Sequence, residues 1–164
     1  MQILVLSDTH GRSEVLSRIL LLHPDAELII HCGDGEAELD EFIGNHPDWA
    51  YKIYHVRGNC DYNSRSPRSL TLDLPHGHRL LAVHGNYLEY GNFMENLAKA
   101  AKEEGADLAL FGHFHKRCDH MLHDIRLFSP GSAAKPRDGL PASYGLIDIF
   151  ENGILTSHAE VPRT

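Results

Sequence analysis

The chain has 164 residues, of which 42% are hydrophobic and 23% charged, and its formal net charge is −8 at pH 7. These values are typical of a globular protein, and the length suits a single domain, which we place over residues 1–164. The negative charge argues against non-specific binding to nucleic acid, because such binding depends on clustered Lys and Arg that neutralise phosphates.

Targeting signals and cysteine usage narrow the class further. No stretch approaches the roughly 18 apolar residues that cross a bilayer. The chain enters a predicted strand directly, without a basic segment, an apolar segment and a cleavage site, so we expect a cytoplasmic protein with no membrane partner. The cysteines Cys32, Cys60 and Cys118 are odd in number and lack Cys-x-x-Cys spacing. They indicate reduced thiols rather than a disulfide framework or a thiolate zinc site.

The first third of the chain alternates strands and helices. Apolar runs predict strands over residues 2–7, 27–32 and 51–56. A helix is expected from Ser13, its predicted N-cap, to about residue 22. A shorter helix is expected over residues 36–43, which carry acidic side chains in the first turn.

From residue 70 onward the pattern changes to hairpins. The runs 70–74 and 79–83, separated by a turn at 75–78, predict two antiparallel strands. A helix at about 93–104 and a strand at 108–111 follow. Four more strands are predicted at 119–122, 125–128, 144–150 and 154–158. The predicted fold class is α/β, with two mixed sheets packed face to face and helices outside.

Five of the apolar runs end in side chains that bind metals. These seven side chains are carboxylates, imidazoles and one amide: Asp8, His10, Asp34, Asn59, His84, His113 and His115. Open α/β sheets build active sites at strand ends, because the strand is rigid and the following loop reaches solvent. A donor set without thiolate suits borderline or hard divalent ions such as Mn²⁺, Fe²⁺, Co²⁺, Ni²⁺ or Zn²⁺.

Each motif taken singly also has an ordinary structural explanation. Asp8-Thr9-His10 fits a turn with a capping aspartate, and the Gly-Asp-Gly and Gly-Asn sequences at 33–35 and 58–59 fit plain turns. A lone strand-end histidine such as His84 is commonly a structural residue with a satisfied hydrogen bond. The joint occurrence at five strand ends favours function. Seven ligands exceed the need of one ion, so we expect two ions about 3.5 to 4 Å apart that share a carboxylate.

The motifs also occur in a recognisable order: Asp8-Thr9-His10, Gly33-Asp34, Gly58-Asn59-Cys60-Asp61, His84-Gly85 and Gly112-His113-Phe114-His115. In this order they resemble the five signatures of the calcineurin-like metallophosphoesterase superfamily, in particular its small, single-domain phosphodiesterase branch in bacteria and archaea. The turn at 130–132 resembles the following loop of that branch. The resemblance implies a four-layer α/β/β/α sandwich, the metallo-dependent phosphatase fold, with a dinuclear site at the strand ends.

The resemblance also implies a role for each ligand. Asp8, His10 and His115 would bind the first ion, Asn59, His84 and His113 the second, and Asp34 would bridge the two. A hydroxide between the ions would be the nucleophile, since two dications lower the pKa of a bridging water. The predicted catalytic residues are therefore Asp34, Asn59, His84 and His113, and Mn²⁺ is the first choice of metal.

Four further residues are candidates for supporting roles. Asp61 resembles the carboxylate that orients ligands in the family. Cys60 stands where many members carry a histidine, and a thiol is a weaker acid than imidazolium and holds no phosphate as a cation, although the small phosphodiesterase branch also accepts Cys. Arg65 and Arg68, which follow the Asn59 loop, are candidates to hold a second phosphate or the far group of a diester. Solvated loop charges are the alternative explanation.

The sequence thus predicts a metal-dependent phosphoesterase, most specifically a phosphodiesterase that hydrolyses a small phosphoester by in-line attack of a metal-bridging hydroxide. A phosphomonoester or pyrophosphate hydrolase with the same ions is one alternative. A non-catalytic protein-binding scaffold is another, because the fold also occurs in a trafficking-complex subunit. The presence of competent side chains at all seven positions favours the enzyme. The sequence does not decide between a monomer and a homo-oligomer.

Overall fold

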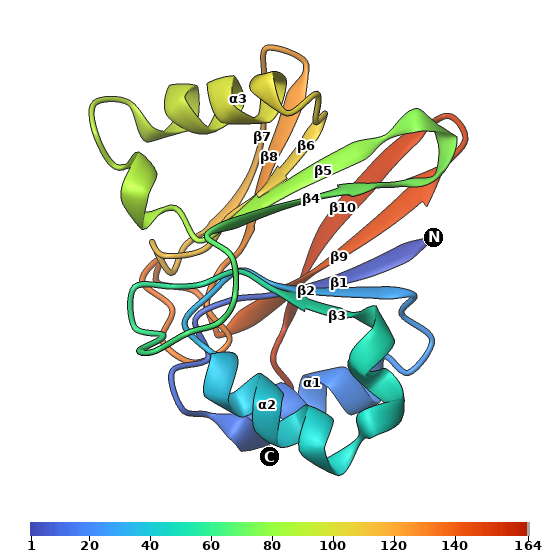
Figure 1. Cartoon of the computed structure of the whole chain (residues 1–164), viewed down its shortest axis with the longest axis vertical. Coiled ribbons are helices and arrows are strands. Elements are labelled where there is room, and N and C mark those ends of the chain that lie inside the picture. Colours follow the sequence, from blue (N-terminus) through green and yellow to red (C-terminus); the bar gives the residue numbers. More distant parts are fainter. Residues whose placement is uncertain (164) are drawn as a thin grey trace.

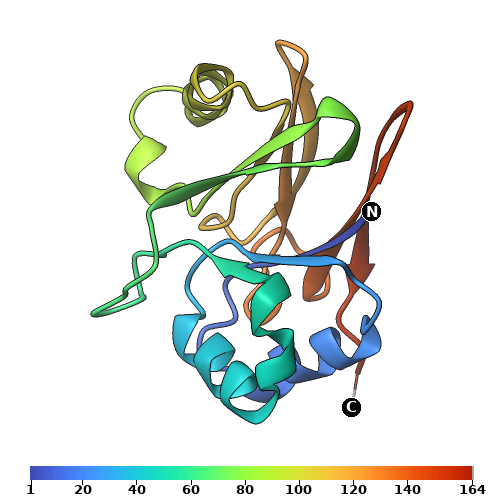
Figure 2. The same ribbon diagram turned by 45° about the vertical axis from the view of Figure 1, so that its right-hand side comes forward.

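Two five-stranded sheets pack face to face in the computed structural model, which describes residues 1–163. Helices cover the outer face of each sheet (Figure 1). In Figure 2 the two layers of strands lie between α1 and α2 (blue to cyan) on one side and α3 (yellow-green) on the other. The predicted α/β class with two mixed sheets and outer helices is confirmed.

The first sheet has the strand order β10-β9-β1-β2-β3. Its parallel part consists of β1 (Gln2–Leu6), β2 (Leu28–His31) and β3 (Ile53–His55), and its antiparallel part adds β9 (Ser143–Phe150) and β10 (Gly153–Glu160). The outer face carries α1 (Ser13–Leu22) and α2 (Glu36–Asn45). β1 and β2 are apolar along nearly their whole length because both of their faces are buried.

The second sheet has the strand order β4-β5-β6-β8-β7. Its strands are β4 (Ser69–Asp73), β5 (Arg79–Val83), β6 (Leu108–Leu110), β7 (Arg117–Leu122) and β8 (Ile125–Pro130). The outer helix is α3 (Phe93–Glu103), whose N-cap Asn92 accepts from the N–H groups of Met94 and Glu95. Short 3₁₀ helices η2 (Pro75–Gly77) and η3 (Asn86–Leu88) follow β4 and β5. No helix within residues 1–163 combines the length and the apolarity needed to span a membrane.

Two local predictions were wrong. Ser13 does not cap α1, because it is the first helical residue and its hydroxyl donates to Glu41 Oε2 at 2.6 Å, which ties α1 to α2. Arg12 takes the cap position without a side-chain hydrogen bond. The third strand starts at Ile53 rather than at residue 51, because the 3₁₀ helix η1 (Pro47–Lys52) occupies the preceding residues. Proline has no N–H and a fixed φ, which suits the first turn of such a helix.

The main core lies between the two sheets. Ile3 and Val5 of β1 face this layer, whereas Leu4 and Leu6 face α1 and α2, because side chains alternate along a strand. From the second sheet, Phe128 of β8 is fully buried in the same layer. Its ring fills the space over Gly145 of β9, where any Cβ would overlap it.

We predict that Phe128→Ala lowers the free energy of unfolding by roughly 3–5 kcal/mol, because it removes a large buried side chain and leaves a cavity. The matched control is His120→Ala on the exposed face of β7. We expect this control to change the free energy by less than about 0.5 kcal/mol. Urea denaturation measures both changes, and equal midpoints for the two variants would show that the layer between the sheets is not the main core.

Candidate metal centre

All seven predicted ligands lie within five residues of the carboxyl end of a strand and meet at one edge of the molecule. Asp8 and His10 follow β1, Asp34 follows β2 and Asn59 follows β3. From the second sheet, His84 follows β5, and His113 and His115 follow β6. Parallel strands place their carboxyl ends on the same side, so the loops that carry these side chains converge from both sheets. The structure therefore brings all seven residues together.

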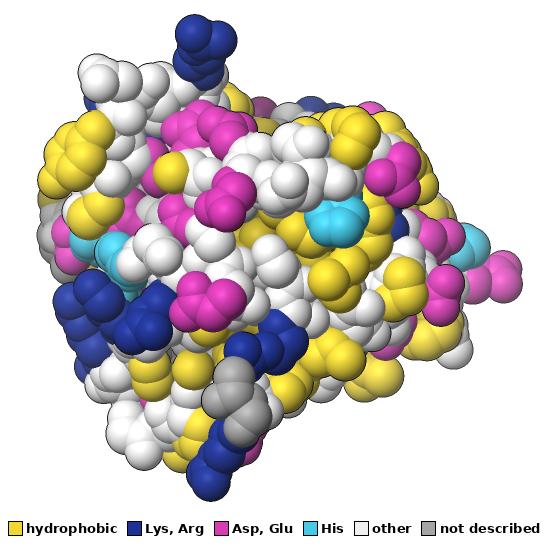
Figure 3. Space-filling view, turned by 90° about the horizontal axis from the view of Figure 1, so that it is seen from below, with side chains coloured by type: hydrophobic (Ala, Val, Ile, Leu, Met, Phe, Trp, Pro, Cys, Tyr) yellow, Lys and Arg dark blue, Asp and Glu magenta, His cyan; other side chains and the backbone are white. Residues whose placement is uncertain are grey.

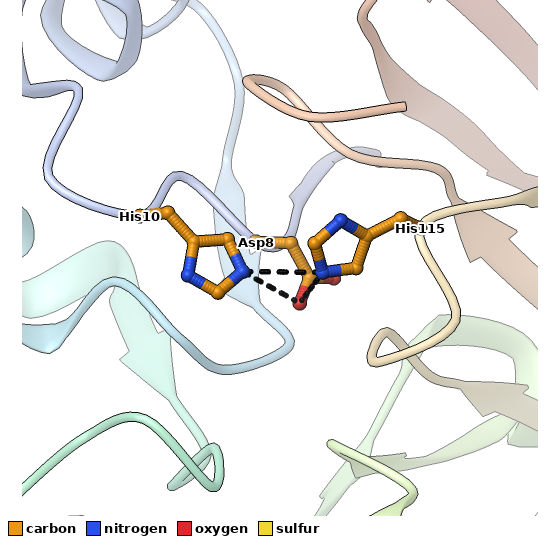
Figure 4. A group of neighbouring side chains, drawn as sticks. All are labelled: Asp8, His10 and His115. Atoms are coloured by element: carbon orange, nitrogen blue, oxygen red, sulfur yellow. Dashed lines mark hydrogen bonds and ion pairs between the residues drawn. The ribbon is translucent and has the colours of Figure 1, made fainter. Parts of the chain in front are cut away.

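The first group of donors consists of Asp8, His10 and His115 (Figure 4). Nε2 of His10 lies 3.1 Å from Nε2 of His115. The Oδ1 atom of Asp8 lies 3.2 Å from His115 Nε2 and 3.7 Å from His10 Nε2. Asp8 and His115 are buried, whereas His10 is reached by solvent.

The second group consists of Asn59, His84 and His113. Asn59 Oδ1 lies 2.9 Å from Nε2 of His84 and 3.0 Å from Nδ1 of His113. The Asn59 amide nitrogen donates to the Cys60 sulfur at 3.5 Å, which leaves the amide oxygen turned toward the two imidazoles.

Asp34 lies between the two groups. Its Oδ2 is 3.4 Å from His84 Nε2 and 3.7 Å from His10 Nε2. Its other oxygen accepts the backbone N–H of Cys60 at 2.7 Å. One carboxylate oxygen thus faces both groups of donors while the other is held by the chain.

The donor atoms fit a divalent cation. Nδ1 of His84 lies 2.7 Å from the Cys32 carbonyl, and Nδ1 of His115 lies 2.7 Å from the Lys135 carbonyl. A carbonyl only accepts, so we assign the proton of each neutral ring to Nδ1, and Nε2 then presents a lone pair. Both lone pairs face carboxylate oxygens, and Asp8 Oδ1 is buried without a hydrogen-bond donor. Electron-rich atoms at these distances repel one another unless a cation lies between them.

The pKa directions follow from the same crowding. Burial raises the pKa of Asp8, but the hydrogen bonds to His10 and His115 outweigh burial and lower this pKa well below its usual value. The hydrogen bond to Asp8 raises the pKa of His115. Burial lowers the pKa of His84, but the Asp34 and Asp8 carboxylates outweigh burial and raise this pKa. Protons and a divalent cation therefore compete for the same lone pairs.

Five of the seven predicted ligands have left-handed backbone conformations. The φ angles are +55° for Asp8, +42° for His10, +61° for Asp34, +70° for His113 and +56° for His115. Such angles cost non-glycine residues energy and concentrate at functional sites. They turn the chain sharply at the strand ends. His113 and His115 consequently reach different groups of donors instead of pointing to one side, as they would in an extended segment.

Asp61 joins two of the ligand loops. Its Oδ2 accepts the N–H groups of Asp34 and Gly58, both at 2.8 Å, and its Oδ1 accepts those of Gly35 and Glu36, both at 3.0 Å. Burial raises the pKa of Asp61, but His55 and these backbone donors outweigh burial and lower this pKa well below its usual value. This arrangement supports the orienting role that we predicted for Asp61.

The loop of Gly58 passes close to Asp34 because residue 58 has no side chain. A Cβ at position 58 would overlap Oδ1 of Asp34. Glycine at position 58 is thus required by the close approach of Asp34, and an ordinary turn would not impose this requirement.

The three other predicted supporting residues lie in different places. Cys60 is exposed beside Asp34, and burial and the Asp34 carboxylate raise the pKa of its thiol, which keeps it neutral. Arg65 lines a cavity of about 900 Å³ together with His10 and Asp34. Arg68 lines a separate cavity of about 340 Å³. The two arginines therefore do not act on one position. On the face in Figure 3, one group of Lys and Arg side chains lies beside histidine at the left edge, and others lie at the top and in the lower part of the view.

The sequence analysis missed Glu89. Its Oε2 lies 2.9 Å from Nε2 of His113, so it accepts the Nε2 proton and leaves the Nδ1 lone pair facing Asn59. Ser7 was missed as well, and its hydroxyl donates to Asp8 Oδ2 at 2.6 Å. Glu89 lies in an irregular loop with no spacing pattern that could have indicated its partner.

We predict that Glu89→Ala weakens Mn²⁺ binding by about 10- to 100-fold, because residues that orient a metal-binding histidine contribute on this scale. Glu89→Gln should restore most of the affinity, since its amide oxygen still accepts the His113 proton. Titration calorimetry of the metal-free variants measures this. Glu151→Ala, in the turn between β9 and β10, is the control for loss of one exposed carboxylate. Unchanged Mn²⁺ affinity in Glu89→Ala would remove Glu89 from the site.

The fold and the site together define a class of protein: an α/β/β/α sandwich with carboxylate, amide and imidazole donors gathered at the shared edge of its sheets. Residues 1–152 match the calcineurin-like phosphoesterase superfamily domain. The chain belongs to this superfamily, which confirms the predicted family and makes it a metal-binding phosphoester hydrolase by class.

Individual relatives agree with this assignment. The chain is 34% identical over 158 residues to the probable metallophosphoesterase YsnB of Bacillus subtilis, covering 95% of this chain and 88% of YsnB. It is 28% identical over 167 residues to the phosphodiesterase YfcE of Escherichia coli K12, covering 90% of this chain and 88% of YfcE. Among solved structures, a predicted phosphoesterase of Streptococcus pneumoniae superposes with a TM-score of 0.82 at 25% identity, covering 98% of this chain and 92% of that one.

Proposed function

We propose that the chain is a phosphodiesterase that hydrolyses a small phosphoester at a dinuclear metal site. Asp8, His10 and His115 would hold the first ion, Asn59, His84 and His113 would hold the second, and the Asp34 carboxylate would be shared between them. The single observation that carries the proposal is the position of Asp34 Oδ2, which lies within 3.7 Å of an imidazole nitrogen from each group. The name of the relative YfcE, a phosphodiesterase, supports the reaction class.

The residues of the site hold the reacting groups in place. When bound, two divalent ions supply a hydroxide nucleophile near neutral pH and neutralise charge on the phosphoryl oxygens. The Cys32 carbonyl and Glu89 fix the ring orientations of His84 and His113. The Cys60 N–H and the Asp61 carboxylate fix the side chain and the backbone of Asp34. A preorganised site of this kind loses little energy to rearrangement during the reaction.

The walls of the larger cavity favour a diester over a monoester. The cavity is lined by two cationic side chains, Arg65 and Lys135, and by the imidazole of His10. Five carboxylate side chains also line it: Asp34, Glu36, Glu38, Asp40 and Asp61. A phosphomonoester carries a charge of about −1.5 to −2 at pH 7, whereas a diester carries a single negative charge. The carboxylates of this wall that are not proposed metal ligands therefore repel a monoester more strongly than a diester, whereas bound dications would attract both. Cys60 adds no positive charge, because a thiol is neutral when protonated and negative when ionised.

Several finer points belong to the same proposal. Mn²⁺ is the first choice of metal, and Fe²⁺, Zn²⁺, Co²⁺ and Ni²⁺ suit the same donors. We further propose that residues 1–164 act as one domain, because β9 and β10 pair beside β1 in the first sheet. We also propose that the protein acts in the cytoplasm. A homo-oligomer is compatible with the proposal and is not required by it.

We predict that Asp34→Asn and His113→Ala each lower kcat/KM for bis(p-nitrophenyl) phosphate with Mn²⁺ by about 1,000-fold. Loss of a properly held ion removes several kcal/mol of transition-state stabilisation, and about 1.4 kcal/mol corresponds to a tenfold rate change. Release of p-nitrophenolate measures the rate. His120→Ala, which removes an exposed histidine of β7 that is not a predicted ligand, should keep the wild-type rate.

Three other results would each point elsewhere. Faster hydrolysis of p-nitrophenyl phosphate or of a nucleoside diphosphate than of the diester would favour the monoester or pyrophosphate alternative. Activity that survives complete removal of metal by a chelator would contradict the metal-dependent mechanism. A metal-loaded protein that hydrolyses none of these compounds but captures a stable protein partner would favour the scaffold.

A further inference from the structure

A small cavity next to Asn59 carries positive charge that no carboxylate balances. Six residues line this cavity of about 340 Å³: Arg57, Gly58, Asn59, Arg68, Asn86 and Tyr87. None of them is acidic. The larger cavity, by contrast, is lined by five carboxylates. In a chain with a net charge of −8, a basic cavity at the edge of the metal centre is a local reversal of charge.

The two guanidinium groups in this cavity have no partner within residues 1–163. Among the other arginines in this part of the chain, the side chains of Arg12, Arg79 and Arg126 pair with carboxylates, whereas Arg65 and Arg137 also lack a side-chain partner. Arg18 and Arg117 donate to backbone carbonyls. The side chains of Arg57 and Arg68, which line the cavity, make no hydrogen bond or ion pair with another residue of the described range 1–163. Both residues are exposed to solvent, and an anion bound between them would neutralise their charge.

The cavity is built from the same loops that carry ligands of the proposed second ion. Asn59 itself lines it, and Asn86 lies two residues beyond His84. The backbone N–H of Arg57 donates to the Pro67 carbonyl at 2.8 Å, which brings the segment of Arg68 beside the Asn59 loop. A group in this cavity would therefore lie next to a phosphoryl group held at the metal centre.

Phosphate is the anion that fits these side chains. A guanidinium presents planar pairs of N–H donors that match phosphate oxygens in a bidentate arrangement. The amide of Asn86 and the hydroxyl of Tyr87, whose residue is 37% exposed, add neutral donors of the kind that bind phosphates. The two arginines disfavour a metal ion in this cavity, because cationic side chains repel it.

We propose that this cavity binds a second phosphate group of the substrate, so that the enzyme prefers phosphodiesters that carry a further phosphate, as in a phosphorylated nucleotide. This inference rests on the proposed phosphodiesterase function. It also separates the two arginines that follow Asn59 in the sequence: Arg68 acts together with Arg57 on the second phosphate, and Arg65 borders the larger, separate cavity.

Two chromogenic substrates test the proposal. Thymidine 5′-(p-nitrophenyl phosphate) and its 3′-phosphorylated derivative contain the same scissile diester and release the same p-nitrophenolate. We expect the wild-type enzyme with Mn²⁺ to show a kcat/KM at least about tenfold higher for the 3′-phosphorylated compound, mainly through a lower KM, since charge-assisted bonds to phosphate are strong. Arg57→Gln and Arg68→Gln should each bring the ratio of the two kcat/KM values toward one.

The control is Arg163→Gln, which removes an exposed arginine away from this cavity and should keep the wild-type ratio. Because the ratio compares two substrates on one variant, a general loss of activity cancels. Two separate arginine variants guard against the misfolding of either one. Equal kcat/KM values in the wild type, or a preference that persists in both variants, would overturn the proposal.

A binding measurement separates this proposal from the proposed function. Titration calorimetry of the Mn²⁺-loaded protein compares thymidine 3′,5′-bisphosphate with thymidine 5′-monophosphate and needs no turnover. Tighter binding of the bisphosphate that is lost in Arg57→Gln and Arg68→Gln supports the cavity even if neither chromogenic compound is hydrolysed, in which case only the phosphodiesterase function fails. Equal binding of the two nucleotides would refute the phosphate site whatever the activity.

Discussion

The Asp34 carboxylate is the point at which the two groups of donors meet. One of its oxygens faces His10 from the first group and His84 from the second. The other oxygen is held by the Cys60 N–H, and the Asp34 backbone is held by Asp61. The Asp34 oxygen and the Nε2 lone pair of His84 repel each other unless positive charge lies between them. The roles proposed for the surrounding residues all depend on this convergence.

The fold supplies the rigidity that this convergence requires. β1 is buried on both faces, between the outer helices on one side and the layer shared with the second sheet on the other. β5 and β6 are held in the same way by the inner layer and by α3. The strand ends are therefore fixed, while the ligand-bearing turns adopt left-handed backbone angles that a less constrained chain would relax. The packing energy of two sheets is what holds five strained residues in place.

Sequence patterns predicted the strands and helices well where they depend on local periodicity. The buried runs before Asp8, Asp34 and His113 are strands, and the seven side chains gather as the strand-end argument requires. Features that depend on pairing between distant residues were not predictable in the same way. Ser13 contacts Glu41 across two helices instead of capping its own, and Glu89 reaches His113 from a loop without any pattern. Periodicity also says nothing about which ring nitrogen faces the site, because backbone carbonyls of Cys32 and Lys135 decide this. The pairing of Arg68 with Arg57 rather than with Arg65 likewise follows from loop geometry alone.

Anomalous diffraction from crystals soaked in Mn²⁺ tests the central claim most directly. The account predicts two peaks per chain, one among Asp8, His10 and His115 and one among Asn59, His84 and His113, with Asp34 contacting both. A single peak that leaves one of these groups without an ion, or peaks only at other positions, would contradict it.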